Sequence, residues 1–205
     1  MSEKPIVFSG VMVRAVLAGT KTQTRRLVKP QPTRLMPVEG KPWPMVQVRW
    51  PADHTLLVGK QCSDEFGRLM EVVRCPYGQP GDRLWVRETW QVVKADANPP
   101  RVWYRADPGV EDCVAKSLVG WQGWRPAIYM PRAACRLVLE VSDVRVERLQ
   151  EISEADAEAE GCFALGDASC TARYQFECLW DSLNAKRAPW ASNPFVWVIS
   201  FRRTP

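Results

Sequence analysis

The sequence predicts an α+β fold that combines several short strands with a few short helices. Residues 83–88 and 135–141 alternate between apolar and polar side chains, as strands with one buried face do. Residues 195–201 form a nearly continuous apolar run, which is typical of a strand that closes a barrel. Three segments have the length and the flanking capping residues of short helices, namely 11–18, 154–160 and 172–183.

We expect a single domain over residues 1–205, since a chain of 205 residues is long enough to bury a real core. Prolines crowd the segment from residue 30 to residue 80, where we predict short strands at 46–50, 56–58 and 69–74. This segment is therefore predicted to be an insertion. It either carries one or two hairpins or forms a lid over a site, and the sequence does not decide between these.

Further strands are predicted at 6–8, 26–28 and 102–104. A strand at 144–149 continues the one at 135–141 after a bend at Ser142 and Asp143. Ser9 and Gly19 are the expected ends of the first helix, and Thr171 caps the last one. The apolar face of that last helix, with Phe176 and Trp180, is interpreted as core.

Composition predicts a cytoplasmic protein that does not enter a membrane. No apolar run approaches the roughly 20 residues that span a bilayer, and residues 1–5 lack the basic and apolar segments of a secretory signal. Lys and Arg number 28 against 23 Asp and Glu, a net charge of +5. This excess, with the basic cluster at 21–34, makes RNA or DNA a possible partner. Most of the 10 tryptophans are expected in the core, and one or two in a cleft would stack on a base.

The cysteines predict neither a metal nor a cofactor. The chain has 7 of them, none forms a Cys-x-x-Cys pair, and His54 has no cysteine near it at zinc-site spacing. Cys162, Cys170 and Cys178 recur at a constant interval that could bring them together on helical segments. We interpret them as buried free thiols, since free cysteine often behaves as a small core residue.

The segment from Gly19 to Arg26 carries the strongest functional signal. It follows the first predicted helix as a polar loop that contains Lys21 and Thr24. An amine beside a hydroxyl is the minimum for a base-activated nucleophile without histidine. A solvated basic turn is the alternative interpretation of the same residues.

Gly19, Lys21, Thr24 and Arg26 behind an apolar helix resemble the signature of the ASCH family of small, PUA-like β-barrels. Most of that family has glutamate where this chain has Thr24. Threonine there is similar to the subgroup that hydrolyses the amide of N4-acetylcytidine, in which this lysine and threonine act with a glutamate from a later helix. Larger ASCH proteins of this kind are often encoded by phages or prophages.

The resemblance places the third catalytic residue at Glu160, which ends the acidic helix that begins after Ser153. A carboxylate at a helix C-terminus needs a cationic partner, because the helix dipole disfavours it there. A shifted alignment would select Glu158 instead. Arg26, Glu88 and Trp85 are secondary candidates for substrate binding or for structural support.

The resemblance thus implies an amidohydrolase that removes the acyl group from N4-acetylcytidine or a related nucleoside. Thr24 would be the nucleophile and Lys21 its base, with Glu160 relaying a proton or orienting groups. Arg26 would hold the oxyanion or buttress the segment. A non-catalytic module that binds RNA or a modified base, and a ribonuclease, are the alternatives.

Overall fold

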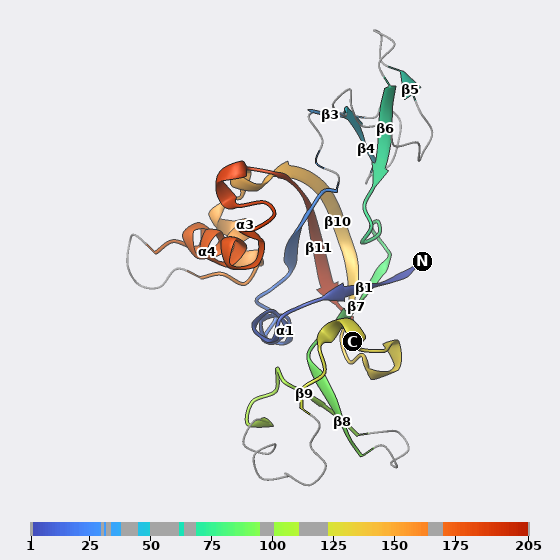
Figure 1. Ribbon diagram of the computed structural model, residues 1–205, viewed down its shortest axis with the longest axis vertical. Coiled ribbons are helices and arrows are strands. Elements are labelled where there is room, and N and C mark those ends of the chain that lie inside the picture. Colours follow the sequence, from blue (N-terminus) through green and yellow to red (C-terminus); the bar gives the residue numbers. More distant parts are fainter. Residues whose placement is uncertain are drawn as a thin grey trace.

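The computed structural model describes residues 2–29, 31, 34–37, 45–49, 62–63, 69–94, 101–110, 123–163 and 170–204. Its centre is a five-stranded sheet in the order β1-β7-β10-β11-β2 (Figure 1). The strands of this sheet are β1 (Glu3–Val7), β2 (Gln23–Leu27), β7 (Arg83–Arg87), β10 (Val138–Arg148) and β11 (Phe195–Arg203). β1 runs parallel to β7, and the other neighbours are antiparallel.

Two smaller sheets project from this centre (Figure 1). The insertion forms a four-stranded sheet of β3 (Arg34–Pro37), β4 (Met45–Arg49), β6 (Leu69–Arg74) and β5 (Cys62–Ser63). A hairpin of β8 (Trp90–Lys94) and β9 (Arg101–Tyr104) forms the other. The strands predicted at 46–50 and 69–74 correspond to β4 and β6. The one predicted at 56–58 lies outside the described residues, as does His54.

The helices are α1 (Gly10–Leu17), α3 (Glu154–Ala159) and α4 (Ala172–Asn184). Single 3₁₀ turns occur at η1 (Ala127–Tyr129), η2 (Arg132–Ala134), η3 (Leu149–Glu151) and η4 (Trp190–Ser192). Strands and short helices together confirm the predicted α+β class. In the part of the chain that the structure describes, no helix is long and apolar enough to cross a membrane.

The central sheet is open, so the expectation that 195–201 closes a barrel is not met by the described strands. β11 lies inside the sheet, between β10 and β2, and β1 and β2 are the two outer strands. Its apolar run has a different cause, because both of its faces are buried. On one face, Phe195, Trp197, Ile199 and Phe201 belong to the core cluster that includes Val13 and Val16 of α1. On the other face, Val196 and Val198 belong to the cluster that includes residues of α3 and α4.

The helix ends follow the predicted capping pattern. The side chain of Ser9 accepts a hydrogen bond from the Met12 amide, and that of Thr171 accepts one from Tyr174. Ser153 caps α3 in the same way through the Asp156 amide. Gly161 follows α3 with a φ of 88°, a left-handed conformation that glycine adopts at low cost.

Three local predictions need correction. The strand predicted at 26–28 begins earlier, at Gln23, so residues 23–25 belong to an edge strand instead of a loop, because β2 pairs with β11, with Thr24 opposite Ile199. Residues 138–148 form one strand, and the bend predicted at Ser142–Asp143 is a bulge within it. β8 was not predicted, although it pairs with β9, which contains the predicted strand at 102–104; this pairing has an irregularity between Val92 and Lys94.

The cysteine prediction holds only in part. Cys162 is buried, but Cys170 is half-buried and Cys178 is exposed. Among the described residues, no three His, Cys, Asp or Glu side chains are grouped so that they could hold a metal ion.

Candidate active site

The functional segment meets the end of α3 at the edge of the central sheet. Lys21 lies between the turn that ends α1 and the start of β2, and Glu160 is the C-terminal cap of α3. The amide of Thr22 donates a hydrogen bond of 2.8 Å to the carbonyl of Ala159, which joins the two segments. Residues that are far apart in the sequence are thereby placed side by side.

Lys21 and Glu160 form a buried ion pair. Lys21 Nζ lies 2.6 Å from Glu160 Oε2, and the two residues are 2% and 4% exposed. Nζ also donates to the backbone carbonyls of Gln23 and Glu160, each at 2.8 Å. All three hydrogen bonds that a lysine ammonium can donate are therefore made. Glu160 gains the cationic partner that its place at the helix C-terminus requires.

A second cation, Arg25, approaches the same carboxylate from β2. Its guanidinium NH1 lies 3.7 Å from Glu160 Oε1, and this oxygen is buried and accepts no hydrogen bond. NH2 of Arg25 contacts Glu147 at 3.1 Å and Asp156 at 3.4 Å. Glu160 thus has one oxygen held by Lys21 and another that faces the Arg25 guanidinium without a hydrogen bond.

Asp156 fastens α3 to this network. It accepts hydrogen bonds from Gln23 Nε2 at 3.0 Å and from Arg145 at 2.9 Å. Burial raises the pKa of Asp156, but the hydrogen bonds from Gln23 and Ser153 and the charges of Arg25 and Arg145 outweigh it. The pKa therefore lies below its ordinary value.

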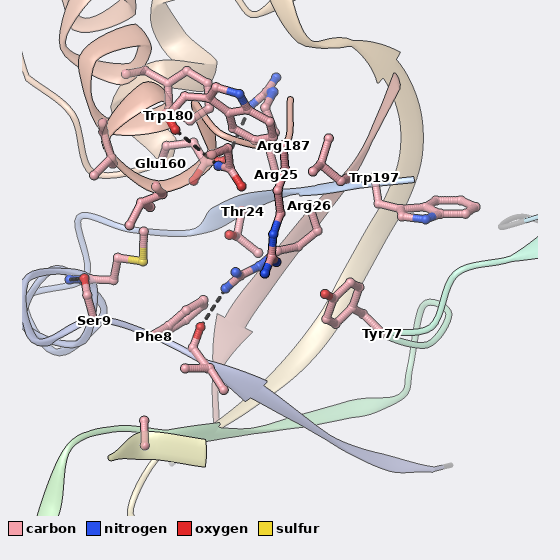
Figure 2. A pocket seen from close by; sticks show the side chains of 18 of the residues that line it. Phe8, Ser9, Thr24, Arg25, Arg26, Tyr77, Glu160, Trp180, Arg187 and Trp197 are labelled. Carbon is pink, nitrogen blue, oxygen red and sulfur yellow. Dashed lines mark hydrogen bonds and ion pairs between the residues drawn. The ribbon is translucent and has the colours of Figure 1, made fainter. Parts of the chain in front are cut away.

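Beside the pair lies a cavity of about 670 Å³ (Figure 2). Thr24 and Glu160 both line it, whereas Lys21 is not among its lining residues. Its walls come from β2, from the residues that follow β1, from α4 and from Tyr77 at the end of the insertion. A volume of this size falls in the range of about 300–1,000 Å³ for small-molecule sites.

The apolar walls of the cavity combine aliphatic and aromatic side chains. Phe8, Tyr77, Phe176, Trp180 and Trp197 contribute to them. Phe176 and Trp180 of α4, interpreted from the sequence as core, are buried and also line the cavity. The expected tryptophans in a cleft are therefore Trp180 and Trp197.

The secondary candidates are divided between the cavity and the framework. Arg26 lines the cavity, and its NH2 donates to the carbonyl of Val7 at 2.7 Å (Figure 2).

Glu88 and Trp85 are not among the lining residues. Glu88 forms a two-point ion pair with Arg136 at 2.8 and 2.9 Å, and burial raises its pKa despite that partner. Trp85 is buried with the guanidinium of Arg87 4.6 Å from its ring centre.

Glu158, the alternative to Glu160, is exposed and does not line the cavity. The arrangement of α3 explains the difference between the two carboxylates. Ala157 is fully buried against the sheet, so Glu158 points to solvent, while Glu160 comes two residues later, at the end of the helix that meets β2.

Gln23, Arg25, Glu147 and Asp156 were not recognised from the sequence as parts of the site. Reading residues 23–27 as a strand would have placed Gln23 and Arg25 on one face by period 2. No comparable signal exists for Glu147, because its role depends on the pairing of β10 with β11 and β11 with β2.

Compared with known proteins, the sequence matches no family model, no curated protein and no solved structure.

Proposed function

We propose that this protein is an amidohydrolase that removes the acyl group from N4-acetylcytidine or a related N4-acylated cytosine nucleoside. One observation carries the proposal. Thr24 and Glu160 line the same aromatic cavity, and the buried Lys21 holds one oxygen of the Glu160 carboxylate from behind. A hydroxyl, a carboxylate and an amine are thus combined without histidine.

The roles that the geometry favours differ in one respect from those expected from the sequence. All the hydrogen bonds of the Lys21 ammonium are already donated, so it has no lone pair to take a proton from Thr24. Glu160 Oε1 accepts no hydrogen bond and belongs to a residue that lines the cavity. We therefore assign the base to Glu160 and the orientation of that base to Lys21.

In the first half of the reaction, Thr24 Oγ1 bonds to the acyl carbonyl carbon and its proton passes to Glu160 Oε1 through a bridging water, because no hydrogen bond joins these two groups in the structure. The tetrahedral intermediate then collapses. The bond from carbon to N4 breaks, Glu160 returns the proton to N4, and cytidine leaves with its exocyclic amine restored. Thr24 retains the acyl group as an ester.

In the second half, water adds to the ester carbon and gives a proton to Glu160. The ester bond to Thr24 then breaks, and Glu160 returns the proton to the threonine oxygen. The acid is released and ionises in solution. Arg26 lines the cavity with its guanidinium and is suited to stabilise the negative oxygen of either tetrahedral intermediate.

We also infer that residues 1–205 form one ASCH-type, PUA-like domain with an insertion at 30–80. The support is the order of Gly19, Lys21, Thr24 and Arg26 behind α1. A later short helix ending at Glu160 adds to it.

The test is to incubate the purified protein with N4-acetylcytidine and measure cytidine by chromatography. Thr24→Ala and Glu160→Gln are each expected to lower kcat/KM by at least about 100-fold, since each removes a group that bonds to or exchanges protons with the reacting atoms. Thr20→Ala and Glu158→Gln are matched controls, because both side chains are exposed and neither lines the cavity. Full activity in Thr24→Ala would remove this threonine as the nucleophile.

A binding module is the second candidate, and the aromatic and cationic walls of the cavity favour it. The same experiment separates the two classes. A binding module for acetylated cytidine would bind the nucleoside but release neither cytidine nor acetate. Binding would be detected by quenching of tryptophan fluorescence.

A further inference from the structure

The charged residues that line the cavity are predominantly cationic. Arg25, Arg26, Lys29 and Arg187 contribute positive charge, and Glu160 is the carboxylate among the lining residues. Arg25 and Glu160 belong to the buried network, where their charges offset each other. Arg26 is assigned to the oxyanion, so Lys29 and Arg187 are the lining cations for which the hydrolysis of a neutral amide has no use.

These three cations have no acidic partner in the described ranges of the chain. Arg26 donates to a backbone carbonyl, and its buried Nε makes no hydrogen bond there. Lys29 and Arg187 are exposed, and neither forms an ion pair with a described carboxylate. Lys29 follows β2 and Arg187 follows α4, so two separate segments bring cations to one cavity.

The chemistry of cytidine determines where an anionic group would lie. The acylated N4 and the ribose are on opposite sides of the pyrimidine ring. If the acyl group is bound at the buried Thr24 and Glu160, the ribose extends away from them, toward more exposed parts of the lining. Lys29 and Arg187 are exposed side chains of that lining.

We propose that the substrate is phosphorylated, so that the cavity takes a nucleoside phosphate with an N4-acylated cytosine in preference to the neutral nucleoside. Lys29 and Arg187 bind the phosphate, as ammonium and guanidinium groups commonly do. This inference rests on the proposed function for the orientation of the base. The phosphate is carried either by a mononucleotide or by the backbone of an oligonucleotide.

The experiment compares kcat/KM for N4-acetylcytidine, its 5′-monophosphate and a trinucleotide with one central N4-acetylcytosine. The protein is expected to prefer at least one phosphorylated substrate by about tenfold, and less in high salt, because exposed charges are screened. The double variant Lys29→Ala/Arg187→Ala should lose most of this preference. The preference is the ratio of kcat/KM for two substrates of the same variant. An effect of the substitutions that is equal for both substrates therefore cancels in this ratio.

Lys186→Ala/Arg203→Ala is the matched control, since it removes the same charge from exposed residues that do not line the cavity. This control variant should keep the preference for the phosphorylated substrate. Equal use of all substrates by the wild-type protein overturns the inference and leaves the amidohydrolase proposal standing. A preference that survives in the Lys29→Ala/Arg187→Ala variant also overturns it.

If none of the substrates is hydrolysed, the proposed function fails, and the anion site is tested by binding alone. Calorimetric titration with cytidine and with cytidine 5′-monophosphate then decides. Tighter binding of the monophosphate, lost in the Lys29→Ala/Arg187→Ala variant, supports the phosphate site, and equal binding overturns it. Preference for the trinucleotide over the monophosphate identifies the oligonucleotide as the source of the phosphate.

Discussion

At the scale of single residues, the site depends on an ion pair that water does not reach. The side chains of Lys21 and Glu160 are 0% and 3% exposed, so each charge has lost its hydration and relies on the other. The pair is retained despite this desolvation cost. In the proposed mechanism the pair holds the Glu160 carboxylate in one orientation, a role that apolar residues could not fill.

Replacing one member of the pair should therefore destabilise the fold. Lys21→Met is expected to lower the free energy of unfolding by about 3 kcal/mol or more, because it leaves the Glu160 carboxylate buried without its nearest cation. Urea denaturation measures the change. The double variant Lys21→Met/Glu160→Leu should recover part of the loss. A double variant as unstable as the sum of the two single variants would show that the residues are not coupled.

Thiol reactivity distinguishes Cys162, which follows α3, from Cys178 within α4. Burial raises the pKa of Cys162 to about 11, and the nearby Glu160 adds to the effect, so this thiol is largely protonated at neutral pH. Cys178 is exposed on α4. Iodoacetamide at pH 8 should label Cys178 much faster than Cys162, as measured by peptide mass spectrometry. Equal labelling of the native protein would contradict the burial of Cys162.

At the scale of secondary-structure elements, the end of α3 determines where Glu160 lies. A Cβ atom at Gly161 would come within 3.2 Å of the Ala15 Cβ and 3.5 Å of the Lys21 Cβ. The absence of a side chain thus allows α3 to approach α1 and β2 closely. The positive φ of Gly161 is also unfavourable for any other residue type.

Gly161→Ala is predicted to destabilise the protein by about 1–2 kcal/mol and to lower kcat, because both the backbone strain and the crowding displace Glu160. Gly109→Ala is the control. Gly109 also has a positive φ of 71°, but nothing lies within 4 Å of the position that a Cβ atom would occupy there. It should show a loss of stability from strain alone, with kcat unchanged. Equal effects of both variants on kcat would contradict the packing argument.

The helices and their caps were predictable from the sequence because their signals are local. Ser9, Ser153 and Thr171 each precede a helix and satisfy its first amides. The motif and the acidic helix pointed to Lys21, Thr24 and Glu160, and the structure brings Lys21 into contact with Glu160 and places Thr24 and Glu160 on one cavity. Their catalytic roles stay a prediction. The contact between Arg25 and Glu147 could not be recognised, since it depends on strand pairing across more than a hundred residues.

At the scale of the whole molecule, the cavity lies where the central sheet is open. Its walls include β2, one outer strand, and Val7 and Phe8 at the end of β1, the other. Arg26 spans between them by donating to the Val7 carbonyl. The missing closure that distinguishes this sheet from a complete barrel thus provides room for a ligand.

Stability should fall in acid through the network that joins α3 to this sheet. The pKa of Asp156 is lower in the folded protein than its usual value of about 3.9, so the unfolded chain binds protons more readily. The contribution of the Asp156 carboxylate to the stability of the fold is present above about pH 4 and is lost as the pH falls through the lower, native pKa. Asp156→Asn should therefore reduce the melting temperature at pH 7 and have a smaller effect near pH 2, because protonation in acid removes part of what the wild-type carboxylate contributes. Glu158→Gln, an exposed control, should leave the pH profile unchanged, and an equal effect of Asp156→Asn at both pH values would contradict the assignment.

The central claim is that Thr24 receives the acyl group. The most direct measurement is mass spectrometry of the peptide that carries Thr24, from protein quenched in acid during its first turnover of N4-acetylcytidine. The account predicts an increase of one acetyl group on Thr24, formed as cytidine is released and before acetate appears. Cytidine and acetate that appear together, with Thr24 unmodified throughout, would contradict it.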